Sequence, residues 1–182
     1  MSESDVTASR LLLAEYERLK EEQKVRIGFR DSLIYASLAS MAAVITAALT
    51  SRGHANLLLL LPPVTTLLGW TYLTNDEKVS AIGRYIREDL GRRLAAEVEA
   101  EVFGWEAAHR SDPHRRSRKM LQLIVDLGGF CAPALVAIVI FWINGPLRSP
   151  FVVVSIAEAV FVCGLAVSIV RYADLDADPA GT

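Results

Sequence analysis

Four apolar segments, arranged in two pairs, constrain the fold of this 182-residue chain more than any other feature of its sequence. Each has close to the ~20 residues that a helix needs to cross the hydrocarbon core of a membrane. The pattern predicts an all-α fold, a polytopic membrane helical bundle with four transmembrane helices. The segments are Ser32–Thr50, Asn56–Leu73, Leu121–Ile143 and Phe151–Val170.

The distribution of basic residues predicts how these segments are oriented. The polar stretch Asn75–Lys119 separates the two apolar pairs and holds 10 of the 19 lysines and arginines. Of the remainder, only Arg52 and Arg148 lie in the short connections within the pairs. Lysine and arginine accumulate on the cytoplasmic side of membrane proteins. We therefore expect a multi-pass protein of the cell inner (plasma) membrane with both termini in the cytoplasm.

The same pattern divides the chain into five parts. We expect a cytoplasmic amphipathic helix, a first transmembrane hairpin, a cytoplasmic helix with a basic loop, a second transmembrane hairpin and an acidic disordered tail. In that order they cover residues 1–31, 32–74, 75–119, 120–171 and 172–182.

The amino-terminal arm has a helical pattern that continues into the first apolar segment. Side chains on one face recur at steps of three and four residues, and no proline interrupts the run. The residues before Ser9 are small and polar and are expected to fray. The pattern predicts one continuous helix over Ser9–Thr50. The face consists of Leu12, Tyr16, Leu19, Gln23, Ile27 and Arg30.

The polar centre carries a similar stripe, which predicts that the second apolar helix continues to about Phe103. This helix begins where a membrane segment ends, whereas the arm ends where one begins. The two are therefore expected to pair as an antiparallel cytoplasmic helical stalk. A solvated, unpaired arm is the alternative. The stripe consists of Val79, Ile82, Ile86, Leu90, Leu94, Val98, Val102 and Trp105.

Two adjacent prolines interrupt the second apolar segment. Pro62 and Pro63 have no N–H group, so backbone carbonyl oxygens about one turn earlier lose their partners. We expect a helix kink here, with the freed carbonyls bonded by Thr65, Thr66 or a polar group on another helix.

Two carboxylates fall within the apolar segments. Asp126 lies near the predicted cytoplasmic boundary, where it can reach lipid headgroups or nearby basic residues. Glu158 lies near the middle of the fourth segment, where a charge is costly. One interpretation is a protonated Glu158 that bonds to Thr46, at matching depth, or to a freed carbonyl. The other is an ion or proton pathway.

A basic cluster precedes the third apolar segment. It serves membrane topology, and it can also bind anionic lipid headgroups. Neither His109 with His114 nor Cys131 with Cys163 has the spacing of a metal site, and both cysteines are interpreted as small buried hydrophobic residues. We expect no metal and no cofactor. The cluster consists of Arg115, Arg116, Arg118 and Lys119.

The sequence contains no motif for catalysis. It lacks a phosphate loop, an HExxH pattern and a paired-cysteine motif, and its formal net charge of −2 indicates no nucleic-acid partner. We expect a non-enzymatic protein that contacts the lipid bilayer and acts by homo-oligomerisation or by binding a cytoplasmic protein partner. An ion or proton channel or transporter that uses Glu158 is the alternative.

Three stretches carry a resemblance to known proteins. Residues 15–27 have the pattern E-Y-x-x-L-K-x-E-x-x-x-R-I, residues 75–88 the pattern N-D-x-x-V-x-x-I-G-R-Y-I-R-E, and residues 103–106 read F-G-W-E. The chain thereby resembles a family of uncharacterised bacterial four-span integral membrane proteins. The layout of its first half is also similar to the SLATT-type membrane effectors of bacterial conflict systems, which have two spans. The second resemblance implies membrane perforation on activation.

Overall fold

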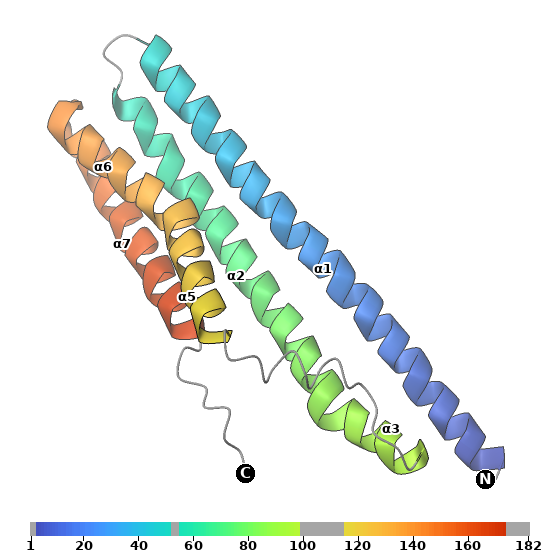
Figure 1. The fold of residues 1–182 in the computed structure, drawn as a ribbon. Coiled ribbons are helices and arrows are strands. Elements are labelled where there is room, and N and C mark those ends of the chain that lie inside the picture. The colour runs from blue at the N-terminus through green and yellow to red at the C-terminus, as the bar shows by residue number, and fades with distance from the viewer. Residues whose placement is uncertain (1–2, 52–54, 99–114, 174–182) are drawn as a thin grey trace. The chain divides into compact units, whose positions relative to one another are not determined.

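The computed structural model describes residues 3–51, 55–98 and 115–173, and within these ranges every regular element is helical (Figure 1). The predicted helix end near Phe103 and most of the predicted acidic tail lie outside these residues. In chain order the elements are α1 (Glu3–Thr50), a 3-10 helix (Ala55–Leu60), α2 (Leu61–Tyr85), a π-helical turn (Ile86–Leu90), α3 (Gly91–Val98), α5 (Arg115–Asp126), a second π-helical turn (Leu127–Cys131), α6 (Ala132–Asn144) and α7 (Ser149–Tyr172).

Four continuous helical stretches are long and apolar enough to cross a membrane. This confirms the prediction of an all-helical fold with four such segments. The stretches are Ala8–Thr50, Ala55–Glu97, Ser117–Asn144 and Ser149–Tyr172.

The first of these helices is continuous, as predicted, but begins earlier. α1 starts at Glu3 rather than Ser9, so the helix includes residues 3–8, which were expected to fray.

The described residues form two compact units, each with its own apolar core. The first unit contains residues 3–30 and 75–98 with Arg115, and the second contains residues 31–51, 55–74 and 116–173. α1 and α2 each contribute to both units.

The first unit is an antiparallel pair, in which the first part of α1 lies along the end of α2 and α3. Arg30 Nη1 lies 2.9 Å from Asp76 Oδ1. Gln23 Nε2 donates to the Val79 carbonyl at 3.3 Å. At the far end four side chains are buried and three more pack against them. The buried ones are Leu12, Ile86, Leu90 and Leu94, and the others are Tyr16, Leu19 and Ile82.

One polar contact crosses this pair beside the apolar core. The Tyr85 hydroxyl donates to Glu15 Oε1 at 2.7 Å. This hydrogen bond to the carboxylate is the main reason that the pKa of Tyr85 lies above its ordinary value, with partial desolvation as a second cause. The phenol therefore stays protonated, and able to donate, throughout the neutral range.

The buried face of α1 differs from the prediction at one position. Ile27 is 38% exposed, whereas Arg26 and Arg30 are partly buried. The face follows alternating steps of four and three residues along Leu12, Tyr16, Leu19, Gln23, Arg26 and Arg30, which is the heptad spacing of paired helices. Asn75 Nδ2 donates to the Arg26 carbonyl at 2.7 Å, so this position contacts the partner helix through its backbone.

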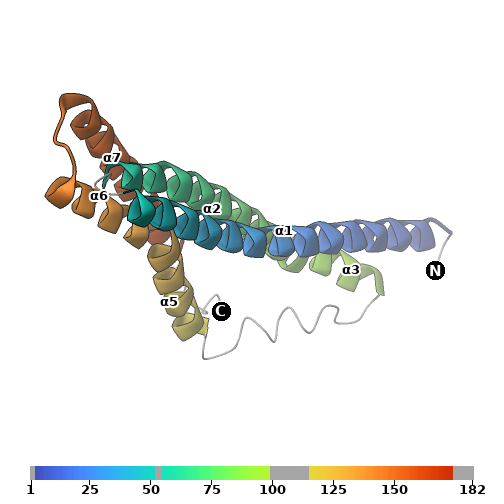
Figure 2. The same ribbon diagram turned by 90° about the horizontal axis from the view of Figure 1, so that it is seen from above.

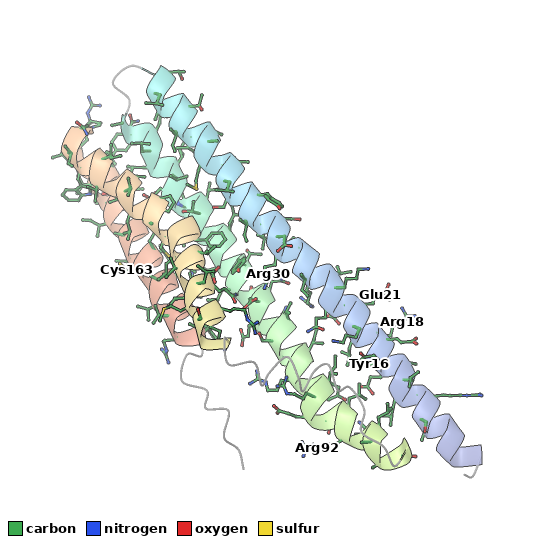
Figure 3. The ribbon with its side chains drawn as sticks, viewed as in Figure 1. Tyr16, Arg18, Glu21, Arg30, Arg92 and Cys163 are labelled. Carbon is green, nitrogen blue, oxygen red and sulfur yellow. The ribbon has the colours of Figure 1, made fainter. Side chains whose placement is uncertain are left out.

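A π-helical turn keeps the apolar face of the second helix in register with α1. The Gly91 N–H donates to the Ile86 carbonyl, five residues earlier instead of four. A π turn holds one residue more than an α turn. The extra residue brings Leu90 and Leu94 onto the face of Ile86, and places Arg93 outside, 3.4 Å from Asp89. The Arg92 side chain donates to the Glu88 carbonyl within the same stretch (Figure 3).

The second unit packs α6, α7 and the beginning of α2 side by side (Figure 1). One apolar cluster joins Leu59, Ile138 and Phe141, with Phe151 and Ala159 against it. Trp142 Nε1 of α6 donates to Ser155 Oγ of α7 at 3.1 Å. A larger cluster lies farther along the helices and contains Leu33, Tyr72, Leu73, Phe130, Cys131, Ala134, Val162, Leu165 and Ile169.

The second π-helical turn precedes Pro133 and accompanies a change of direction between α5 and α6 (Figure 2). Pro133 has no N–H to donate to carbonyls four or five residues earlier. The buried Ser37 hydroxyl of α1 donates to one of these carbonyls, that of Gly129, at 3.3 Å. A side chain of another helix therefore supplies a hydrogen bond that the proline cannot make.

Pro62 and Pro63 lie in the first turn of α2, directly after the 3-10 helix. The second apolar segment therefore changes helix type at the prolines, and an angular kink stays a prediction. Thr65 Oγ1 donates to the Leu61 carbonyl at 3.1 Å and to the Pro62 carbonyl at 3.3 Å. Thr66 Oγ1 is buried and has no hydrogen-bond partner among the described residues.

Candidate functional site

Glu158 lies on the buried face of α7. The face follows steps of three and four residues, through Ser155, Glu158, Val162, Leu165 and Ile169. The other four side chains are 0–3% exposed, and Glu158 is half-buried among them. The carboxyl group is therefore directed toward neighbouring helices by the same periodicity that buries the apolar residues.

One oxygen of the Glu158 carboxyl group has no hydrogen-bond partner among the described residues. Its Oε2 atom is buried and no described residue donates a hydrogen bond to it. Ser155, one turn earlier, is not available, because its hydroxyl already donates to the Val152 carbonyl at 2.9 Å and accepts from Trp142. Buried polar atoms are normally hydrogen-bonded, so Glu158 is an exception that calls for a functional or structural reason.

The contact between α2 and α7 shows which part of α2 lies opposite Glu158. A Cβ atom placed on Gly69 of α2 would lie only 2.6 Å from Leu165 Cδ2 of α7. Pro62 and Glu158 each precede this contact by seven residues, which is two turns on the same helix face. Since α2 and α7 run in the same direction (Figure 1), Pro62 and Glu158 lie at the same level.

The level of Glu158 is rich in oxygen acceptors. Carbonyl oxygens of Leu58–Leu60 receive no backbone donor from Pro62 or Pro63. The buried Leu59 side chain belongs to the cluster that contacts Ala159, the neighbour of Glu158. Thr66, one turn beyond Pro62 on the same face of α2, adds a buried hydroxyl without a partner. The level therefore combines a carboxyl oxygen and a hydroxyl without hydrogen-bond partners in the described part of the chain with carbonyls to which the two prolines cannot donate.

The structure does not bring Thr46 to Glu158. The Thr46 side chain is exposed on α1, and its carbonyl accepts a hydrogen bond from Thr50 at 2.9 Å. Asp126 is only 7% exposed, so it faces the interior of the second unit rather than lipid headgroups. Depth estimated from the sequence does not specify the helix face on which each residue lies.

The predicted headgroup-binding cluster lies at the start of α5. Arg118 is exposed and Lys119 is half-buried, whereas the side chains of Arg115 and Arg116 lie outside what the structure describes. Lipid binding by this cluster stays a prediction.

Both cysteine thiols are free, and Cys163 is exposed on α7 (Figure 3), which corrects the expectation that both cysteines are buried. Within the described ranges, no three metal-ligating side chains are grouped.

A second feature lies in the first unit, where sequence reasoning found none. A groove of about 670 Å³ runs beside α1, between oppositely charged side chains. Two large apolar residues lie on it, Val25 at 67% and Phe29 at 50% exposed. The sequence could have indicated this groove, because neither Val25 nor Phe29 lies on the heptad face of α1 that pairs with α2. The groove is lined by Arg18, Glu21, Glu22, Val25, Arg26, Phe29 and Asn75, of which Arg18 and Glu21 are labelled in Figure 3.

The apolar part of α1 has an uncovered face of small residues in the second unit. The side chains are exposed and recur at steps of four and three residues. Larger apolar side chains, including Tyr35, Leu38 and Leu49, occupy a separate exposed face. The small residues are Ala36, Ala39, Ala43, Thr46 and Thr50.

Comparison of the chain with protein-family models, with curated proteins and with solved structures returned no match.

Proposed function

We propose that this chain is a four-span membrane protein that acts by assembling with copies of itself through α1, with both termini in the cytoplasm. The observation that carries the proposal is the groove beside Val25 and Phe29. Residues 15–31 of α1 are rich in charges and cannot lie in hydrocarbon. Large apolar side chains exposed to water beside a charged rim are typical of protein contact surfaces.

A second copy fits this groove because its rim carries both signs of charge. Arg18 and Arg26 alternate with Glu21 and Glu22 around Val25 and Phe29. In a symmetric contact the same surface meets itself, so acidic residues of one copy can lie against basic residues of the other. A partner protein of strongly acidic or strongly basic character would meet repulsion from one half of this rim.

The apolar part of α1 independently supports assembly. Only 11% of the most apolar 18-residue stretch of Ala8–Thr50 is buried within the chain. The corresponding share for Ala55–Glu97, the helix that contains α2, is 50%. Small residues such as Ala36, Ala39 and Ala43 allow membrane helices to approach closely. We propose that this face contacts α1 of another copy, while the larger apolar side chains contact lipid.

The antiparallel helix pair of the first unit serves, in this proposal, as a cytoplasmic stalk that places the groove outside the membrane. The protein acts through contacts and has no catalytic role. Its resemblance to four-span bacterial membrane proteins, and in layout to SLATT-type effectors, extends the proposal to a membrane effector whose assembly perturbs the bilayer.

The proposal predicts that Phe29→Ser weakens self-association at least ~5-fold, since central aromatic residues at interfaces often contribute about 1 kcal/mol or more. Leu13→Ser is the matched control. Leu13 is 49% exposed on the same helix but does not line the groove. Sedimentation equilibrium in detergent measures the association of each variant. A wild-type protein that stays monomeric at all concentrations, or equal losses in both variants, would contradict the proposal.

An ion or proton pathway is the second candidate function. It is favoured by the unsatisfied Glu158 carboxyl group, because charged groups within membrane segments usually lie on ion or proton routes or face other polar groups. Pathway and assembly differ in one measurement, the effect of Glu158→Gln on the flux of ions or protons through liposomes that contain the protein. Flux that this variant abolishes supports the pathway, and flux that it leaves unchanged contradicts it.

A further inference from the structure

We propose that Glu158, together with the carbonyl oxygens freed by Pro62 and Pro63, binds a small cation, either a proton or a monovalent metal ion. The proposal concerns binding within one chain, and it holds whether or not copies assemble through α1. A proton and a metal ion are alternatives with the same chemistry, because each supplies positive charge to a group of oxygen acceptors.

The first step is that no described group donates a hydrogen bond to the buried oxygen of Glu158. Glu158 Oε2 is buried without a hydrogen-bond donor, and an ionised carboxylate can only accept. The carbonyl oxygens before Pro62 and Pro63, at the same level on the neighbouring helix, also only accept. Acceptors that face one another in a poorly hydrated interior repel, unless a proton or a cation lies between them.

The second step is that no charged side chain supplies the missing positive charge. Three of the neighbouring elements, the 3-10 helix, residues 61–71 of α2 and α6, contain no titratable side chain. Tyr72 and Cys131 belong to the cluster around Leu165 and Ile169, farther along the helices. On the remaining elements, Tyr35 of α1 is 71% exposed, and Asp126 of α5 adds negative charge.

The third step is the discontinuity of the helix opposite Glu158. The second apolar segment changes from a 3-10 helix to an α-helix at Leu61, directly before Pro62. Interrupted membrane helices supply unsatisfied carbonyls that coordinate Na⁺ or protons in other folds. Here Thr66 places a further buried oxygen one turn beyond the break, and hard oxygen ligands of this kind suit monovalent cations and protons.

The test is the stability of the protein in detergent as a function of pH, and of NaCl or KCl against choline chloride at constant ionic strength. The wild-type melting temperature should rise either as the pH falls or as Na⁺ or K⁺ increases. Glu158→Gln removes the charge and keeps the shape, and should abolish that dependence. Glu77→Gln replaces an exposed carboxylate of the first unit and should retain it.

A third variant identifies the bound species. Thr66→Val removes a hydroxyl ligand, so it should raise the apparent dissociation constant of a metal ion at least ~10-fold and leave a proton-dependent transition unchanged. If Glu158→Gln does not fold, the double substitution Pro62→Ala, Pro63→Ala restores the backbone donors and should weaken the cation dependence while Glu158 remains. The variant that decides is Glu158→Gln or, if that protein does not fold, the double proline variant. If its melting temperature depends on pH and on cations as that of the wild type does, the proposal is overturned.

Discussion

Replacing Gly69 by alanine is expected to destabilise the protein by about 1–3 kcal/mol, the usual cost of adding a methyl group to a packed interior. The new Cβ would lie 2.6 Å from Leu165 Cδ2 and 3.1 Å from Phe130 Cβ. Leu165 is 0% and Phe130 2% exposed, so neither side chain has free space into which to move. The substitution must push α7 and the second π-helical turn away from α2.

Gly164→Ala is the matched control for this prediction. No atom lies within 4 Å of the Cβ position at Gly164, which is exposed in the same unit. Alanine favours the helix over glycine by about 0.5–1 kcal/mol, so this variant should be neutral or more stable. Thermal unfolding in detergent, followed by circular dichroism, measures both. A Gly69→Ala variant as stable as Gly164→Ala would show that α2 and α7 are not in close contact.

Inserting one alanine between Glu88 and Asp89 is expected to separate the α1–α3 core, whereas deleting Glu88 is expected to be tolerated. The insertion rotates Leu90 and Leu94 away from Leu12, at about 1.5–3 kcal/mol for each leucine moved from the core to solvent. After the deletion the two leucines follow Ile86 by three and seven residues. That spacing keeps all three on one face of a regular α-helix, so the π turn is no longer needed.

Limited proteolysis provides the measurement for this pair of variants. Cleavage by trypsin at Arg92 and Arg93 should be faster for the insertion than for the wild type, and unchanged for the deletion. Faster cleavage of the deletion variant as well would show that the π turn does more than correct the register of Leu90 and Leu94.

Apolar length and helical periodicity were sufficient to predict the four apolar helices, the continuity of α1 and most of its buried face. Ile27 was misplaced because steps of three and four residues can be combined in several ways. Only the partner helix, through the bond from Asn75 to the Arg26 carbonyl, selects one of them. The level of Glu158 was predicted from depth, but the exposure of Thr46 depends on which face of α1 packs against its own chain.

The π-helical turns were not predicted, because their causes are tertiary. The first exists because Leu94, rather than Arg93, must meet Leu12 in the core. The second precedes Pro133, and the bond from Ser37 to Gly129 compensates for the missing N–H. Part of that signal was available, since every proline within a helix leaves a carbonyl about one turn earlier to be satisfied. The sequence did not indicate which residue would satisfy it.

The most direct test of the account is the side of the membrane on which each connection lies. In a Cys131→Ala, Cys163→Ala background, a membrane-impermeant maleimide is added to intact cells that carry a single new cysteine. We expect labelling of Ser149→Cys, at the start of α7, and none of Ser80→Cys, which is exposed on the helix pair, until the membrane is permeabilised. Labelling of Ser80→Cys in intact cells, with Ser149→Cys protected, would contradict the four-span arrangement with cytoplasmic termini.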